Sequence, residues 1–90
     1  MQAATISNSL KTLRLGDNSA LTSLTIYNNE LETIDLTKAV SLKYLNAENN
    51  KLNNIDFNKN INLTSLNLTG NKLTEIDVRE NTALEFLSVS

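Results

Sequence analysis

The sequence predicts a solenoid, in which short parallel β-strands stack into one sheet, with extended or turn segments on the opposite side and little or no α-helix. Three observations predict this class. Apolar residues, mostly leucine, recur every 21 residues, and an asparagine recurs in phase with them. Within each period apolar and polar residues alternate, as they do along a half-buried strand. The segments between the strands lack helical periodicity and are rich in asparagine and threonine, which disfavour helix interiors.

Residues 63–71 carry the clearest copy of the repeated motif and read L-x-x-L-x-L-x-x-N. Leu66 and Leu68 are two positions apart, so an extended strand points both side chains to the same side. An asparagine follows each strand, and we expect its side chain to bond backbone groups that the turn leaves unpaired. The expected strands are 23–27, 44–48, 65–69 and 86–89. The asparagines are Asn8, Asn29, Asn50 and Asn71.

The second half of each repeat alternates again between apolar and polar residues. In its first complete copy, Ile34 and Leu36 should point inward and Asp35 should point outward. This pattern predicts a short extended segment on the convex side, and a second narrow parallel sheet is one form that it could take. A helix is not expected there, because only ten residues lie between Leu31 and Leu42.

The connections between repeats are expected to be polar turns at 37–41, 58–62 and 79–83. Each should hold at most one partly buried apolar residue, which would be Val40 in the first turn and Ile61 in the second. The chain has only two glycines, Gly16 and Gly70. Other turns that need a positive φ must therefore use asparagine or aspartate, which tolerate that conformation better than most residues.

The repeat length divides the chain without a change of period from Leu10 to Val89, so one domain is predicted over residues 1–90. In the first, partial repeat, Ala3 and Thr5 are expected to take the places of Leu24 and Ile26, which would make a small-sided first strand. The predicted units are a partial repeat at 1–20, complete repeats at 21–41, 42–62 and 63–83, and a partial repeat at 84–90.

The whole unit reads L-x-x-L-x-[LIVA]-x-x-N-x-L-x-x-[IL]-[DR]-[LFV]. This pattern resembles the leucine-rich repeat family, and its length and I-D-[LFV] segment are most similar to the short bacterial repeats of internalin J and related surface proteins. The resemblance implies a leucine-rich repeat solenoid with a concave parallel sheet, an interaction role such as cell adhesion, and an extracellular or cell-surface location for the parent protein. In internalin J-type repeats the second inward strand position is often cysteine. Here it is aliphatic, so no property of stacked cysteines is carried over.

Composition excludes several classes of function. The net charge is −2, with 8 basic and 10 acidic residues mixed along the chain, which does not give the clustered basic surface that nucleic acids need. Without histidine or cysteine the chain has no disulfide, no thiolate zinc site and no Ser-His or Cys-His catalytic pair. No targeting signal precedes the repeats, and no stretch is long and apolar enough for membrane insertion. We therefore expect no enzyme and no cofactor.

The outward positions of the concave sheet form the candidate binding face. Most of its side chains are short, neutral and polar, but three are aromatic and suit the role of anchors: Tyr27, Tyr44 and Phe86. Alternatively, Tyr44 and Phe86 only cover neighbouring coils. The residues of the candidate face are Ser23, Thr25, Tyr27, Tyr44, Asn46, Glu48, Ser65, Asn67, Thr69, Phe86 and Ser88.

A column of aspartates is expected on the convex side, made by Asp35, Asp56 and Asp77. A calcium ion could relieve the repulsion between stacked carboxylates. However, Lys38 and Lys59 lie three residues beyond the first two aspartates, and aspartate also bonds turn amides well. No metal site is predicted.

The sequence ends directly after a strand-forming stretch, so Leu84, Leu87 and Val89 are expected to form a bare edge. Uncapped repeats and open strands recruit partners. We expect a homodimer or a higher oligomer, most directly through the last strand against its copy.

Three functions follow from these features. The first is a non-enzymatic scaffold that binds a protein partner through the concave sheet or the open ends. The alternative is a structural or engineered self-assembling fragment whose only ligand is itself. The third is glycan binding by the asparagine, threonine and tyrosine side chains of the sheet.

Overall fold

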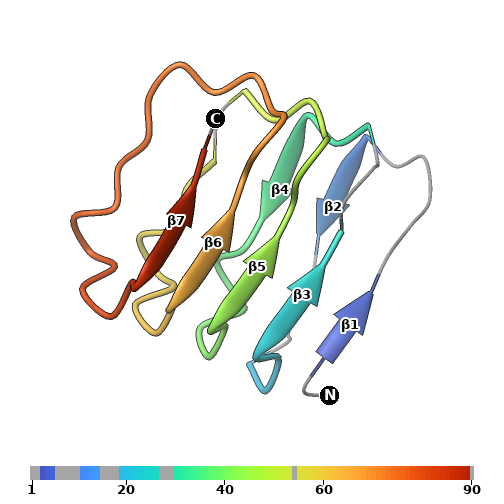
Figure 1. The fold of residues 1–90 in the computed structure, drawn as a ribbon. Helices are drawn as coiled ribbons and strands as arrows, with labels where there is room; N and C mark the ends of the chain where they lie inside the picture. Colours follow the sequence, from blue (N-terminus) through green and yellow to red (C-terminus); the bar gives the residue numbers. More distant parts are fainter. Residues whose placement is uncertain (1–2, 6–10, 15–18, 27–29, 54, 90) are drawn as a thin grey trace.

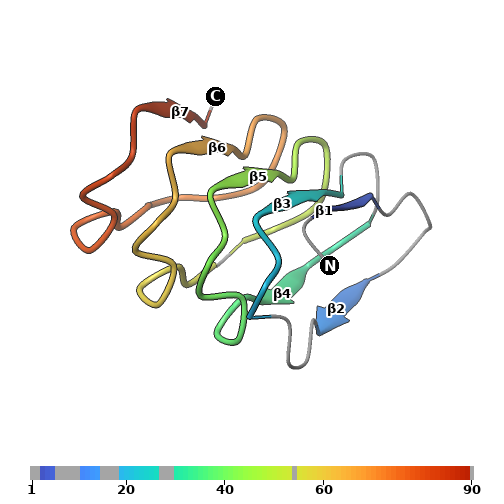
Figure 2. The ribbon, with the colours of Figure 1, turned by 90° about the horizontal axis from the view of Figure 1, so that it is seen from below.

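Seven short strands form two parallel sheets on opposite sides of the chain (Figures 1 and 2). The computed structural model describes residues 3–5, 11–14, 19–26, 30–53 and 55–89, and no helix occurs in these segments. The larger sheet has the order β1-β3-β5-β6-β7 and the smaller one pairs β2 with β4. The strands are β1 (Ala3–Thr5), β2 (Thr12–Arg14), β3 (Ser23–Thr25), β4 (Thr33–Asp35), β5 (Tyr44–Asn46), β6 (Ser65–Asn67) and β7 (Phe86–Ser88).

The strand register follows the sequence period. Leu24 of β3 pairs with Leu45 of β5, which pairs with Leu66 of β6, and Leu66 pairs with Leu87 of β7. Each step is therefore 21 residues, and one repeat brings the chain back to the next position in the sheet. The predicted repeat-type β fold with parallel strands is confirmed, as is the absence of helix from the described segments.

Equivalent apolar residues of successive repeats stack into rows that form the core. Leu24, Leu45 and Leu66 are each at most 1% exposed. Burial of each such side chain stabilises the folded state by about 1.5–3 kcal/mol relative to an exposed side chain. The stacked repeats cover these side chains themselves, without a layer of helices over the sheet. The buried apolar residues are Leu21, Leu24, Ile26, Leu31, Ile34, Leu36, Ala39, Leu42, Leu45, Ala47, Leu52, Phe57, Leu63, Leu66 and Leu68.

Asparagine side chains bind the main chain where it leaves the sheet. The Nδ2 group of Asn50 donates to the carbonyls of Ile26 and Ala47, each at 2.9 Å, and its Oδ1 accepts from the amide of Leu31 at 3.2 Å. Asn71 makes the equivalent bonds one repeat later. The predicted role is thus confirmed for these two residues. Two further asparagines assigned this role, Asn8 and Asn29, lie outside the described residues.

The register of the first strand differs from the prediction. Ala3 pairs with Ser23 and Thr5 pairs with Thr25, so the offset is 20 residues instead of 21. Ala3 and Thr5 consequently lie at the outward positions, where both are exposed, and do not take the places of Leu24 and Ile26. A shift of one residue exchanges the two faces of a strand. The strands β2 and β4, in contrast, pair at an offset of 21 residues. The segment from β1 to β2 is therefore one residue shorter than the equivalent segment from β3 to β4.

The turns at 37–41 and 58–62 each bury a residue other than the one that the sequence indicated. Val40 is 43% exposed and Ile61 is 55% exposed, so the expectation of partly buried apolar residues was wrong. The residue before each one is buried instead: Ala39 and Asn60 are both 0% exposed. Asn60 donates through Nδ2 to the carbonyl oxygens of Leu36 at 3.1 Å and Ala39 at 2.8 Å. These bonds join the turn to the preceding repeat, where the apolar Ala39 holds the equivalent buried position.

Asn81 repeats this arrangement one repeat later, with Nδ2 bonds to the carbonyl oxygens of Phe57 at 3.0 Å and Asn60 at 2.9 Å. It is 4% exposed. The convex turns therefore have an asparagine ladder of their own, in addition to the one that follows the sheet.

Positive φ occurs at two equivalent positions among the described residues, Asn49 with φ 59° and Gly70 with φ 78°. Asn49 confirms that asparagine substitutes for glycine in these turns. A Cβ atom on Gly70 would collide with the Asn49 side chain of the preceding repeat, so stacking favours glycine there independently of φ. Gly16 lies outside the described residues.

The convex side is extended, but only its first two copies form strands. Ile34 is 8% exposed, Leu36 is 1% exposed and Asp35 is exposed, as predicted. The second narrow sheet consists of β2 and β4 alone. The described residues at 55–57 and 76–78 are not in strands, although Phe57 is still buried.

Replacing Asn50 tests whether its side chain holds the repeat together. Asn50→Leu keeps the branching and the number of heavy atoms of the side chain but leaves the buried amide of Leu31 without its acceptor. It also removes the Nδ2 donor from the carbonyls of Ile26 and Ala47, although the carbonyl of Ala47 keeps Asn71 as a second donor. We therefore expect the free energy of unfolding to fall by about 1–3 kcal/mol. Urea unfolding measures this change. The matched control is Asn53→Leu at an exposed position, which should change stability by no more than about 0.5 kcal/mol. Equal effects of the two substitutions would contradict the role of Asn50.

Candidate functional site

The candidate face is the side of the five-stranded sheet that points away from the core, here called the outer face. Two columns of side chains cross it. Ser23, Tyr44, Ser65 and Phe86 are paired in register in the first column, and Thr25, Asn46, Asn67 and Ser88 are paired in the second. The sheet thus brings these eight predicted residues together on one surface, and Glu48 and Thr69 lie two residues beyond the ends of β5 and β6.

Two aromatic side chains dominate the exposed apolar area of this face. Tyr44 is 36% exposed and Phe86 is 69% exposed, and Ser65 lies between them in the same column. Two strand spacings separate the aromatic residues, which is about 10 Å. The third predicted anchor, Tyr27, lies outside the described residues.

The asparagines of the outer face are partly engaged by their own chain. Asn46 Oδ1 accepts the amide of Glu48 at 3.1 Å, and Asn67 Oδ1 accepts the amide of Thr69 at the same distance. These local bonds take amides that a longer strand would use, which explains why β5 and β6 end earlier than predicted. They also hold each asparagine side chain in one orientation.

Thr69 and Ser88 are joined by a hydroxyl contact of 2.6 Å between neighbouring repeats. The polar groups of the outer face are therefore ordered by short internal bonds. A face of this kind can bind by shape and hydrogen bonding.

The predicted edge lies along β7. Leu87 is 42% exposed and Val89 is 44% exposed, whereas the equivalent residues of the preceding repeat, Leu66 and Leu68, are each 1% exposed. Leu84 is less exposed, because it packs against the core. Among the described strands, β7 has a neighbour on one side only.

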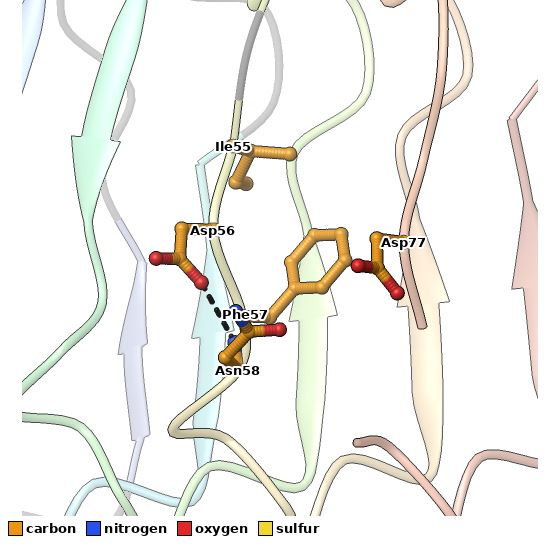
Figure 3. A pocket seen from close by; sticks show the side chains of 5 residues that line it. All are labelled: Ile55, Asp56, Phe57, Asn58 and Asp77. Carbon is orange, nitrogen blue, oxygen red and sulfur yellow. Dashed lines mark hydrogen bonds between the residues drawn. The ribbon is translucent and has the colours of Figure 1, made fainter. Parts of the chain in front are cut away.

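A shallow hollow of about 260 Å³ lies on the convex side and is lined by Ile55, Asp56, Phe57, Asn58 and Asp77. Figure 3 shows the ring of Phe57 between the two aspartates. Asp56 accepts the backbone amide of Asn58 at 2.9 Å, so its carboxylate closes a turn of its own chain. Asp35 binds the amide and hydroxyl of Thr37 in the same way. In the described part of the chain, no three acidic residues lie close enough to hold a metal ion.

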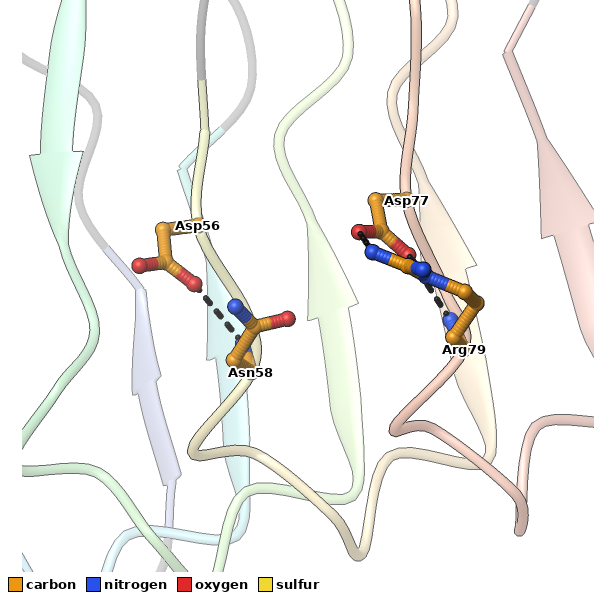
Figure 4. Close-up of polar contacts among 4 residues, drawn as sticks. All are labelled: Asp56, Asn58, Asp77 and Arg79. Atoms are coloured by element: carbon orange, nitrogen blue, oxygen red, sulfur yellow. Dashed lines mark hydrogen bonds and ion pairs between the residues drawn. The ribbon is translucent and has the colours of Figure 1, made fainter.

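Asp77 has an additional partner (Figure 4). Its Oδ2 lies 2.9 Å from a guanidinium nitrogen of Arg79, and its Oδ1 accepts the backbone amide of Arg79 at 3.1 Å. The side-chain hydrogen bond from Arg79, followed by the backbone one, lowers the pKa of Asp77 below its usual value. The same pair raises the pKa of Arg79. Both side chains are largely in solvent, so the pair orders the turn and adds little to stability.

Comparison with known proteins agrees with the repeat pattern. Residues 62–82 match the model of the Leucine Rich Repeat family. This segment, which contains β6 and the turn after it, is therefore supported as a leucine-rich repeat. The comparison with curated proteins and the comparison with solved structures each gave no significant match.

Leucine-rich repeats commonly mediate contacts between proteins, and they are typically scaffolds without catalytic activity. The described segments include no helix with the length and apolar character needed to span a membrane.

Sequence reasoning missed two members of the outer face. Ala3 and Thr5 extend the two columns onto β1, because they pair with Ser23 and Thr25. The signal that could have found them is weak. Ala3, Ala4 and Thr5 are all small, so the inward and outward positions of this strand do not differ in character.

The Asp77–Arg79 pair has a testable consequence for acid titration. Because the pKa of Asp77 is lowered in the folded chain, its contribution to stability is present above the unfolded pKa and is lost as the pH falls through the folded one. Arg79→Ala should raise the pKa of Asp77 toward its usual value, as measured by NMR titration of the carboxyl carbon. Lys59→Ala, a cation removed from the neighbouring turn, is the control. An unchanged Asp77 titration in Arg79→Ala would show that the ion pair does not form in solution.

Proposed function

We propose that this chain is a leucine-rich repeat solenoid that binds a protein partner through the outer face of its five-stranded sheet. The observation that carries the proposal is the column of Tyr44, Ser65 and Phe86, in which two exposed aromatic rings flank a small polar residue. Exposed aromatic side chains on a rigid surface are the groups that most often anchor protein interfaces.

The rigidity of the outer face supports binding by shape. The strands β3, β5 and β6 are each backed by a buried leucine, and Asn46 and Asn67 are held by the amides two residues beyond them. A partner therefore meets side chains that are already ordered and loses less conformational entropy on binding. The neutral, short residues around the aromatics supply a polar rim that can form hydrogen bonds at the edge of an interface.

A location for the parent protein at a bacterial cell surface is part of this proposal. It is supported by the repeat length and the I-D-[LFV] segment, which resemble the repeats of secreted bacterial proteins. Adhesion to another protein would be the corresponding role.

A second candidate is self-association through β7, in which the chain is its own ligand. The exposed apolar side chains of Phe86, Leu87 and Val89 favour it, because they gather in β7 and the residue that follows it. In this case Tyr44, two strands away, takes no part.

Substitution of the aromatic residues tests the outer face. The chain would be screened against an array of bacterial and host surface proteins and of glycans, and the affinity for each hit would be measured. Tyr44→Ala should weaken binding of a protein partner by about tenfold or more, since a buried aromatic anchor commonly contributes over 1 kcal/mol. The matched control is Ile61→Ala, which removes an exposed apolar side chain from a turn away from the sheet.

A loss of binding in Ile61→Ala but not in Tyr44→Ala would place the interface on the turns and overturn the proposal. Hits confined to glycans would favour sugar binding by the same face. Self-association that survives Tyr44→Ala belongs to the β7 edge.

A further inference from the structure

Four side chains of the outer face surround one point between β5 and β6. Tyr44 and Asn46 lie on the same side of β5. Ser65 and Asn67 are their partners in register on β6. Neighbouring strands are about 4.8 Å apart and alternate residues of one strand about 6.6 Å apart, so these residues mark the corners of a small rectangle, here called the β5–β6 cluster. It lies inside the sheet, because β3 and β7 flank the two strands.

The side-chain amide nitrogens of the cluster are available to a ligand. Oδ1 of Asn46 accepts the amide of Glu48 at 3.1 Å. Oδ1 of Asn67 accepts the amide of Thr69, also at 3.1 Å. Neither Nδ2 group donates to another residue in the described part of the chain, and neither is among the buried polar atoms that lack a partner. Both Nδ2 groups are therefore accessible to solvent, and each offers two N–H donors on a side chain that is already ordered.

The charges around the cluster match a neutral ligand. None of its four residues is charged. Lys43 directly precedes β5, and Glu48 lies two residues beyond its end, so a cation and a carboxylate flank the strand at opposite ends. A ligand with a net charge would be attracted by one of them and repelled by the other. A neutral ligand meets neither penalty.

The neighbours of Tyr44 differ from those at the centre of a protein interface. Such a centre is mostly apolar, and serine is depleted there. Tyr44 is 36% exposed and lies between Ser23 and Ser65 in its column. The next outward residue of its own strand is Asn46. An aromatic ring enclosed by hydroxyl and amide groups suits a ligand that has both an apolar surface and many hydroxyl groups.

We propose that the β5–β6 cluster binds a neutral sugar ring of a glycan that the protein partner carries. A pyranose has an apolar C–H face and an edge of hydroxyl groups. The C–H face packs on the ring of Tyr44. The hydroxyl oxygens accept hydrogen bonds from Nδ2 of Asn46 and Asn67, and the hydroxyl of Ser65 can donate or accept. The inference rests on the proposed function and names the chemistry that the outer face recognises.

Titration with single sugar rings tests the site by NMR of the isotope-labelled chain. The probes are the methyl glycosides of glucose, galactose and mannose, and the control is glycerol, a polyol without a ring. The side-chain amide signals of Asn46 and Asn67 should shift and saturate with a millimolar Kd, because one ring on an open face forms few contacts. The signal of the exposed Asn53 should stay in place. No shift with any glycoside, or equal shifts with glycerol, would overturn the proposal.

Variants that copy equivalent positions of other repeats test the role of each side chain. Tyr44→Ser introduces the residue found at the equivalent positions of β3 and β6, and it should abolish saturation by removing the ring. Asn67→Thr introduces the residue found at the equivalent position of β3, and it should weaken binding about fivefold, the loss expected for one hydrogen bond. Asn53→Thr, outside the sheet, is the matched control and should change nothing. Binding that survives Tyr44→Ser would contradict the site.

Removal of glycans from a protein hit separates this inference from the proposed function. A hit from the array of surface proteins would be measured before and after enzymatic removal of its glycans, and the sugar site predicts that removal weakens binding about tenfold or more. Binding that is unchanged by removal but weakened by Tyr44→Ala would overturn the sugar site and keep the outer face as a protein interface. Binding that is insensitive to Tyr44→Ala would contradict the proposed function itself.

Discussion

The structure depends on hydrogen bonds from asparagine side chains to the main chain of neighbouring repeats. The strands are three residues long, so most of the main chain that passes the core is outside a regular ladder. Buried main-chain groups without partners would cost about 1–3 kcal/mol each. Asn50 and Asn71 satisfy such groups after the sheet. In the convex turns, Asn60 and Asn81 add a second hydrogen bond to carbonyls that already accept a main-chain amide. Each of these residues reaches into the repeat before its own, so the bonds that complete one repeat also join it to its neighbour.

Because the repeats are joined through their interior, the outer face of the sheet remains available for binding. Apolar rows and asparagine ladders stabilise the stack from within, and the outward side chains of the sheet are not part of the apolar core. Ser23, Ser65 and Thr25 are small and only partly exposed, and Phe86 is largely exposed. The stacking of apolar rows also explains the exposure of apolar side chains at β7. Where a row reaches β7, its members Leu87 and Val89 have no following repeat among the described residues, and side chains that are buried elsewhere become surface.

The period of the sequence was sufficient to predict the inward rows, the sheet register from β3 to β7, and the asparagines that follow the strands. It succeeded because Leu45 and Leu66 differ sharply from their polar neighbours. It failed where that contrast is absent. Ala3, Ala4 and Thr5 can face either way, so the deletion of one residue in the first repeat left no mark in the pattern.

The convex turns were misjudged for a different reason. Val40 and Ile61 attracted the assignment of buried residue because they are apolar, but the backbone geometry of the turn buries the position before them. There Asn60 is stabilised by carbonyls that only the folded turn brings together. Hydrophobicity alone cannot reveal a buried polar residue whose partners are 21 and 24 residues away. For the candidate site, the sequence identified the members of each column but not their exposure, which depends on the size of the neighbours in the adjacent strands.

The most direct test of this account is the hydrogen-exchange rate of individual asparagine side-chain amides, measured by NMR under native conditions. If the amides connect the repeats, the Nδ2 protons of Asn50, Asn60, Asn71 and Asn81 should exchange together and far more slowly than those of the exposed Asn53 and Asn58. Equal, fast exchange at all six residues would contradict the claim that these side chains hold the structure together.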